Sequence, residues 1–358
     1  MKHLYGLILA GGRGTRFWPR SRKSSAKQVL NVVGERSLIQ ATIDRLSPLI
    51  SPDRIWILTN DYVRDAIVRQ LPQVPKRQIL SEPVQRNTAP AIGLAAQILH
   101  AADPDAVMGV FPSDHVIGKP APYRATLRAA FRGAAAGKLM VVGIPPRWPE
   151  TGYGYIEFPR HGRTLRAGQL LPVLKFHEKP QLPKAKRYLA AGNYFWNSGM
   201  FFWRTDVLLE DLRRHLPKTA TVLAALPPFG SRRFTAGLES AFPLCENISI
   251  DYALLEKSDK VSGIPAPDFG WNDVGSWNAV YELLPRDGHG NVMVHQSVCL
   301  DSHNNYVDAR GKTVALLGVE GLIVVDTPDA LLVAARDRAQ QVGEIVKALE
   351  KQQRHELL

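Results

Sequence analysis

The sequence predicts an α/β protein, in which a large domain with a mixed, mainly parallel sheet is followed by a small C-terminal β-rich domain. Three observations support this fold class. Short apolar runs alternate with helical stretches as far as residue 144, a turn cluster lies at 285–290, and closely spaced apolar runs follow it. The length of 358 residues suits about two domains, and 45% hydrophobic residues are ample for their cores.

The first part of the chain contains the expected sheet and its covering helices. Strands are expected at 4–9, 55–58, 78–80, 107–111 and 139–144. Helices are expected between them, at 38–46, 62–71, 89–101 and 123–137. Right-handed crossovers place helices on both faces of such a sheet, and ligands bind outside the carboxyl ends of its strands. The residues that follow 4–9 and 107–111 should therefore face one crevice.

The second part is expected to begin after the turn cluster, which gives domains at 1–286 and 287–358. Strands are expected at 297–300, 305–307, 314–317, 322–325 and 330–333. A final helix should start near Asp337, because apolar side chains then recur at helical spacing through Leu349. We expect this apolar stripe to pack against the rest of the molecule.

Composition narrows the classes of function. The formal net charge is +12, from 45 basic and 33 acidic residues, which favours anionic ligands. No basic run is long enough for a nucleic-acid-binding arm, and two cysteines make no disulfide framework. The sequence contains no run of about 18 apolar residues, so we expect no membrane span. The apolar start of the chain leads directly into glycines, so we interpret it as a strand and expect a cytoplasmic protein.

The most informative stretch is residues 9–16, here called the glycine loop. Glycines after a strand let the backbone turn tightly, and successive amides in such a turn form an anion-binding concavity. Arg13 and Arg16 lie in this loop and Lys27 lies shortly after it. Backbone amides rimmed by cations predict a polyphosphate site.

Two similar motifs do not fit. A Walker A loop needs Gly-Lys-Ser/Thr after its first glycine; Gly311-Lys312-Thr313 has that triplet, but Tyr306 occupies the place of the required glycine. A dinucleotide fingerprint needs a third glycine where this chain has Phe17.

The glycine loop through Lys27 resembles the nucleotide-binding signature of sugar-1-phosphate nucleotidyltransferases. Seven further blocks narrow the resemblance to the mannose-1-phosphate guanylyltransferase (GDP-mannose pyrophosphorylase) family, over nearly the whole chain. The blocks are Glu82-Pro83 with 86–91, Pro112-Ser113-Asp114-His115, 149–156, Glu178-Lys179-Pro180, 196–201, Ser249-Ile250-Asp251-Tyr252 and 271–277. One departure is Ala26, which stands where the family usually has proline, and which should loosen the turn before Lys27.

The resemblance implies a Rossmann-like nucleotidyltransferase domain, whose stretch 153–204 binds the sugar, and a left-handed β-helix-like C-terminal domain. It also implies the short form of the family, without the isomerase domain that longer relatives carry, so we expect no isomerase activity. The C-terminal coil makes a homodimer the expected assembly.

The implied reaction transfers GMP from GTP to α-D-mannose 1-phosphate and releases pyrophosphate. The sugar phosphate attacks the α-phosphorus in line, so the protein must position two polyanions and neutralise charge rather than supply a nucleophile. The resemblance implies that Asp114 and Asp273 hold Mg²⁺. Their carboxylate oxygens are of the ligand type that Mg²⁺ prefers. Arg16 and Lys27 would serve the triphosphate. We interpret His115 as structural.

The resemblance assigns the remaining site residues. Glu82 is the acceptor suited to the N1–H and amine of guanine, and Lys179 would bind the sugar phosphate. The expected nucleotide-binding residues are Ala10, Gly11, Gly12, Gly14, Thr15, Arg16, Glu82, Asn87, Thr88 and Ser113. The expected sugar-phosphate-binding residues are Gly152, Glu178, Lys179 and Asn197.

Three alternatives stay open. A sister enzyme using UTP or dTTP with glucose 1-phosphate shares the glycine loop. A non-catalytic regulatory subunit could keep the same fold, although Lys27, Asp114 and Asp273 are all intact here. A nucleic-acid binder would also be positively charged; we expect no nucleic-acid or membrane partner.

Overall fold

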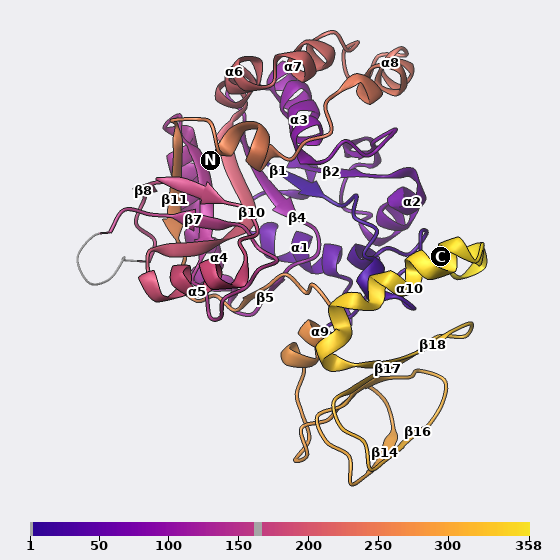
Figure 1. The fold of residues 1–358 in the computed structure, drawn as a ribbon. Coiled ribbons are helices and arrows are strands. Elements are labelled where there is room, and N and C mark those ends of the chain that lie inside the picture. Colours follow the sequence, from indigo (N-terminus) through magenta and orange to yellow (C-terminus); the bar gives the residue numbers. More distant parts are fainter. Residues whose placement is uncertain (1–2, 161–166) are drawn as a thin grey trace.

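The computed structural model describes residues 3–160 and 167–358. Within these residues, ten strands form one mixed sheet in the order β3-β2-β1-β4-β10-β6-β11-β8, with β7 pairing with β10 and β9 pairing with β7 (Figure 1). Its strands are β1 Leu4–Leu9, β2 Ile55–Thr59, β3 Ile79–Ser81, β4 Val107–Pro112, β6 Leu139–Ile144, β7 Tyr155–Glu157, β8 Leu171–Pro172, β9 Lys175–His177, β10 Tyr194–Arg204 and β11 Val261–Pro265. The expected α/β fold class is confirmed.

Helices cover both faces of this sheet. They are α1 Leu38–Leu46, α2 Asp61–Gln70, α3 Thr88–Ala102, α4 Pro120–Ala135, α5 Leu182–Ala191, α6 Thr205–His215, α7 Pro217–Ala224, α8 Phe234–Ala241, α9 Trp277–Leu283 and α10 Val342–Lys351. Neighbouring residues of β1 enter different cores, because strand side chains alternate between faces: Leu7 packs with α3 and Ile8 with α1 and α4. Helix α1 starts at the capping box of Ser37 and Gln40.

The parallel part of the sheet aligns the ends of its strands. Strands β2 and β4 pair in parallel on either side of β1, with Leu9 opposite both Leu58 and Pro112. The chain therefore leaves β1 and β4 at the same edge, as the sequence predicted. Strand β10 then runs antiparallel between β4 and β6, and its register shifts between Asn197 and Phe201. Such a bulge redirects side chains locally.

Helix α5 and helices α6–α8 were missed by the sequence analysis. The stretch 153–204 was expected to contain strands and loops, but α5 interrupts it, beginning at a proline-containing turn and ending at Gly192 in the left-handed region (φ 72°). Helices α6 and α7 pack on α3, over the upper face of the sheet in Figure 1.

The C-terminal region forms a small coil of strands. In the described residues, β13 Val292–Met293, β15 Tyr306–Asp308, β17 Leu322–Asp326 and β18 Leu331–Ala335 make one sheet, and β14 Ser297–Leu300 pairs with β16 Val314–Leu317. Two further short strands, β5 Val116–Ile117 and β12 Trp271–Asn272, pair in the first domain. Asn291 and Asn305 are buried within the coil and bond one another at 3.0 Å.

The final helix starts later than expected. A 3-10 segment, Arg336–Gln341, occupies the expected start near Asp337, and α10 follows from Val342. Val342 and Val346 face the core, as the apolar stripe predicted. Helix α10 runs from the coil back across the N-terminal domain (Figure 1). Among the residues described, no helix combines the length and apolar character needed to cross a membrane.

Candidate active site

A cavity of about 580 Å³ opens where β1 and β4 end. The backbone of the glycine loop is fixed at its first turn, because the Ala10 carbonyl accepts bonds from Gln28 Nε2 (2.6 Å) and Thr59 Oγ1 (2.9 Å). The cavity is lined by Leu9, Gly11, Gly12, Gly14, Lys27, Gln28, Glu82, Gln85, Asn87, Thr88, Ala91, Ser113, Asp114 and Asn247. Most of the residues expected at the nucleotide are thus brought to one cavity.

Some cavity residues were not anticipated, and some expected residues lie elsewhere. Gln28 follows the first motif directly and Gln85 lies between the two parts of the block at 82–91, which could have drawn attention to them, whereas Asn247 carries no sequence signal. Ala10 is buried under the loop and acts through its backbone. Thr15 and Arg16 lie outside the cavity beside Gly343 of α10. The structure therefore does not bring Arg16 to the cavity, although the motif had placed it at the triphosphate.

Gly14 requires glycine for two reasons. Its φ of 62° is unfavourable for residues with a side chain, and a Cβ there would lie 2.5 Å from Cβ of Lys27. Ala26, by contrast, has φ −68° and ψ 160°, values that proline also adopts. The unusual alanine therefore keeps the backbone conformation that brings Lys27 into place.

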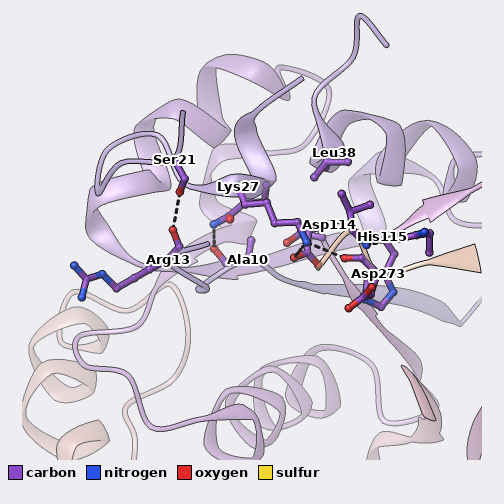
Figure 2. Close-up of polar contacts among 12 residues, drawn as sticks. Ala10, Arg13, Ser21, Lys27, Leu38, Asp114, His115 and Asp273 are labelled. Atoms are coloured by element: carbon purple, nitrogen blue, oxygen red, sulfur yellow. Dashed lines mark hydrogen bonds and ion pairs between the residues drawn. The ribbon is translucent and has the colours of Figure 1, made fainter. Parts of the chain in front are cut away.

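Lys27 links the Asp114 carboxylate to the backbone of Asp273 (Figure 2). Its Nζ donates to Asp114 Oδ2 and to the backbone oxygen of Asp273, each at 2.8 Å. The Lys27 side chain is 8% exposed and that of Asp114 is 33% exposed, so the ammonium is shielded while the carboxylate stays open to the cavity. Burial alone would raise the pKa of Asp114, but the charge and hydrogen bond of Lys27 outweigh burial and lower it. Asp114 is thus held ionised.

A small strand pair delivers Asp273 to this place. Strand β12 pairs with β5, with Asn272 opposite Val116, so the segments carrying Asp273 and Asp114 are joined. Trp271 Nε1 donates to His115 Nδ1 at 3.1 Å. Burial lowers the pKa of His115 to about 4, which keeps the imidazole neutral and suits the structural role expected for it.

Tyr153 holds the Asp273 carboxylate. Its hydroxyl donates to Asp273 Oδ1 at 2.5 Å, and its ring packs edge-on against Trp196 and Trp271. Burial and the Asp273 charge raise the pKa of Tyr153, so the hydroxyl stays a donor. Tyr153 lies within a recognised block, but nothing in the sequence indicated this contact.

Asp114 and Asp273 fit a divalent cation. The Lys27 ammonium bonds the Asp114 carboxylate and the backbone oxygen of Asp273, and one oxygen of each carboxylate accepts neither of the side-chain bonds described above. In the part of the chain that is described, no group of three or more His, Cys, Asp or Glu side chains could hold a metal by itself. Mg²⁺ is commonly bound by one or two carboxylates, with substrate phosphates and water as its other ligands. Asp114 and Asp273 would supply the two carboxylates.

The residues expected at the sugar phosphate gather in a second cluster. Lys179 Nζ donates to Glu178 Oε1 at 2.6 Å, and the backbone of Lys179 has φ 39°, a strained conformation of a kind found at functional sites. Glu178 lies directly over Gly154, where a Cβ would approach Glu178 Oε2 to 2.5 Å. Gly152 is exposed and its amide donates to Glu150. Gly154, rather than Gly152, provides the close backbone approach.

Asn197 brings an unforeseen carboxylate into this cluster. Its Nδ2 donates to Asp251 Oδ1 at 2.8 Å. Burial, and then the charge of Glu178, raise the pKa of Asp251 to about 6. Asp251 belongs to a block that the sequence analysis recognised without giving it a role.

Comparisons with known proteins show the family of this chain. The nucleotidyl transferase family matches residues 5–288, and the MannoseP isomerase/GMP-like beta-helix domain matches residues 295–349. The xanthan biosynthesis protein XanB of Xanthomonas campestris pv. campestris is 41% identical over 360 residues, which cover 99% of this chain and 75% of XanB. A mannose-1-phosphate guanylyltransferase of Escherichia coli K12 is 38% identical over 364 residues, again 99% of this chain and 75% of the relative.

A solved structure extends the similarity to three dimensions. The Thermus thermophilus protein described as a mannose-1-phosphate geranyltransferase matches with a TM-score of 0.85 and 35% identity, over 97% of this chain and 99% of that chain. The likeness therefore includes both the sheet domain and the C-terminal coil.

Proposed function

The chain belongs to the nucleotidyl transferase family as a mannose-1-phosphate guanylyltransferase, and from this premise we propose that it transfers GMP from GTP to α-D-mannose 1-phosphate by in-line attack, with Mg²⁺. The observation that carries the proposal is the contact of Lys27 with both Asp114 and Asp273 beside a cavity lined by backbone amides. This arrangement gathers charge-neutralising groups and offers no covalent nucleophile, as phosphoryl transfer between two anions requires.

The cavity residues divide the work on GTP. The glycine loop would present its backbone amides to phosphate oxygens, while Asn87 and Thr88 at the N-terminus of α3 line the same cavity. Lys27 supplies the positive charge close to the reacting phosphorus. Glu82 is the acceptor proposed for guanine. Arg16 is not among the residues lining this cavity, so its contact with the triphosphate stays a prediction.

The proposed metal ligands are Asp114 and Asp273. When bound there, Mg²⁺ would neutralise charge on the phosphates during transfer. Tyr153 and Lys27 keep the two carboxylates in place before substrate arrives, since each donates a hydrogen bond to one of them. The nucleophilic phosphate of the sugar would be held by Lys179, and the hexose by the carboxylates around it.

The test is pyrophosphate release from each of four nucleoside triphosphates with mannose 1-phosphate or glucose 1-phosphate, with and without Mg²⁺. We expect release mainly with GTP, mannose 1-phosphate and metal. Asp273→Ala should lower kcat about 10²-fold or more, because charge stabilisation is lost. Asp268→Ala is the matched control, since Asp268 is exposed and its carboxylate bonds Lys119 and the Gly270 amide rather than any residue of the cavity lining. Preference for UTP or dTTP with glucose 1-phosphate would replace this proposal with the sister reaction.

A protein that binds GTP but releases no pyrophosphate with any pair would instead be a regulatory subunit. A cytoplasmic location is proposed from the substrates, GTP and a sugar phosphate. The homodimer stays a prediction, which sedimentation equilibrium would measure.

A further inference from the structure

Asp251 is fixed between the nucleotide cavity and the sugar cluster. It begins a one-turn π-helix, Asp251–Leu255, a feature often found at functional sites. The preceding residue, Ile250, donates its amide to Thr88 Oγ1 at 2.9 Å, and Ala89 N donates to the Ile248 carbonyl at 3.1 Å. The segment that carries Asp251 is thereby pinned to the N-terminus of α3, which lines the nucleotide cavity.

Asn197 orients this carboxylate. Its Nδ2 donates to Asp251 Oδ1 at 2.8 Å, while its Oδ1 accepts from the amide of Gly199 at 3.1 Å. The Gly199 amide fixes which end of the Asn197 side chain faces Asp251, because an N–H can meet only the oxygen end. Asn197 was expected to bond the sugar itself. In the structure its amide is engaged on both sides and serves to hold Asp251.

Asp251 has no salt-bridge partner among the described residues. The nearby ammonium of Lys179 bonds Glu178 instead, and both burial and the Glu178 charge disfavour ionisation of Asp251. A half-buried carboxylate whose partners, the Asn197 amide and a backbone amide, are all neutral destabilises a fold unless something else satisfies it. Its second oxygen, Oδ2, accepts no hydrogen bond from any other side chain in the described ranges.

We propose that Asp251 is a specificity-determining residue whose Oδ2 accepts a hydrogen bond from a hydroxyl of the hexose. The inference rests on the proposed function and adds to it a residue for the sugar. A hydroxyl is the fitting partner because it donates to carboxylates in short, strong bonds and brings no charge. Glu178 and Asp251, on either side of Lys179, would then read two hydroxyls while the ammonium binds the phosphate.

The first experiment compares Asp251→Asn with the wild-type enzyme. Loss of a charge-assisted hydrogen bond should raise the KM for mannose 1-phosphate about 10- to 100-fold. The KM for GTP should stay within about twofold of the wild-type value and the Tm should not fall, because only a disfavoured charge is removed. Asp259→Asn, the same change at an exposed site eight residues along the segment, should alter none of these values. An unchanged KM for mannose 1-phosphate would overturn the proposal, as would equal increases in both KM values with a lowered Tm.

The second experiment identifies the hydroxyl without requiring turnover. Calorimetric titration of both proteins with mannose 1-phosphate, its 2-, 3-, 4- and 6-deoxy analogues and inorganic phosphate forms a set of thermodynamic cycles. One deoxy analogue should bind wild-type protein about 10-fold or more weakly than the parent sugar but lose this penalty in Asp251→Asn, while phosphate binds both alike. No coupling at any position would refute the role of Asp251. If one hydroxyl is coupled to Asp251 but the wild-type protein releases no pyrophosphate, the proposed reaction would be refuted and the role of Asp251 would stand.

Discussion

At the scale of single residues, the buried charges of the cavity decide its chemistry. Lys27 and Asp114 neutralise one another across 2.8 Å, so the apo site carries its catalytic charges without leaving either unpaired. Glu82 differs, because burial alone raises its pKa to about 7 and no cation offsets it. A carboxylate poised in this way can change charge in the range where the enzyme works.

The pH dependence of GTP binding follows from Glu82. Its ionised form is the acceptor that we propose for guanine, so the KM for GTP should rise as pH falls below about 7, by up to about tenfold per pH unit. Glu82→Gln should flatten this profile and weaken the preference for GTP. Steady-state kinetics from pH 5.5 to 8.5 would measure both; Glu344→Gln, at an exposed site, is the control. A wild-type KM independent of pH would argue against Glu82 as the guanine acceptor.

The pH dependence of stability that Glu82 causes should be opposite in sign to that of a salt-bridged acid. Its folded pKa of about 7 exceeds the ordinary value of 4.5, so its contribution is fully present below pH 4.5 and is lost as pH rises through 7. Thermal unfolding of the apo protein should therefore show Glu82→Gln stabilising at pH 8, by roughly 2 kcal/mol, and not at pH 4.5.

At the scale of elements, helix α10 supports the glycine loop. It packs on the 3-10 turn Thr15–Phe17, and Glu350 bonds Arg13 across 3.0 Å. This ion pair is exposed and adds little by itself, about 1 kcal/mol at most. The apolar contacts beneath it, including buried Val346, are the stronger support.

We expect Val346→Asp to loosen the loop. A buried unpaired charge should lower the free energy of unfolding by about 3 kcal/mol or more, and the KM for GTP should rise because the loop loses its support. Lys347→Asp, the exposed neighbour, is the control for a new acid on α10. Urea unfolding and GTP titration would measure the two effects. A destabilised variant that still binds GTP with wild-type affinity would show that the glycine loop does not depend on α10.

At the scale of the whole molecule, a buried ion pair joins the two domains. Arg20 follows the glycine loop and bonds Asp308 of the C-terminal coil at 2.6 Å, with side chains 11% and 2% exposed. Arg310 and His295 stand farther from the same carboxylate, at 3.6 and 4.0 Å. The orientation of the coil against the catalytic domain depends on this contact.

Removing the Arg20 guanidinium should weaken the contact between the two domains and lower the free energy of unfolding. Arg20→Met leaves Asp308 buried without its main partner and should cost about 3 kcal/mol in the free energy of unfolding. Asp329→Asn, which breaks the more exposed pair with Arg22, should cost less than about 1 kcal/mol. Chemical denaturation would compare the two variants. Equal costs would mean that Arg310 and His295 satisfy Asp308 without Arg20.

The sequence by itself determined the sheet domain and much of the nucleotide cavity. Strand β1 and helix α1 have the expected bounds, because alternation, helical spacing and the cap at Ser37 are local patterns. The glycine loop and Asp114 lie at one edge because parallel strands end together, a rule that needs no coordinates.

Only the tertiary structure decided how distant segments meet. Tyr153 reaches Asp273 across 120 positions of the chain, and Asn197 reaches Asp251 across 54. Such contacts depend on strand order and on the bulge in β10, which leave no periodic signal in the sequence. Arg16 is the opposite case. The motif predicted a contact with phosphate, whereas in the structure Arg16 lies beside α10 and outside the cavity lining. Local pattern fixes which elements form, and long-range packing fixes which side chains share a site.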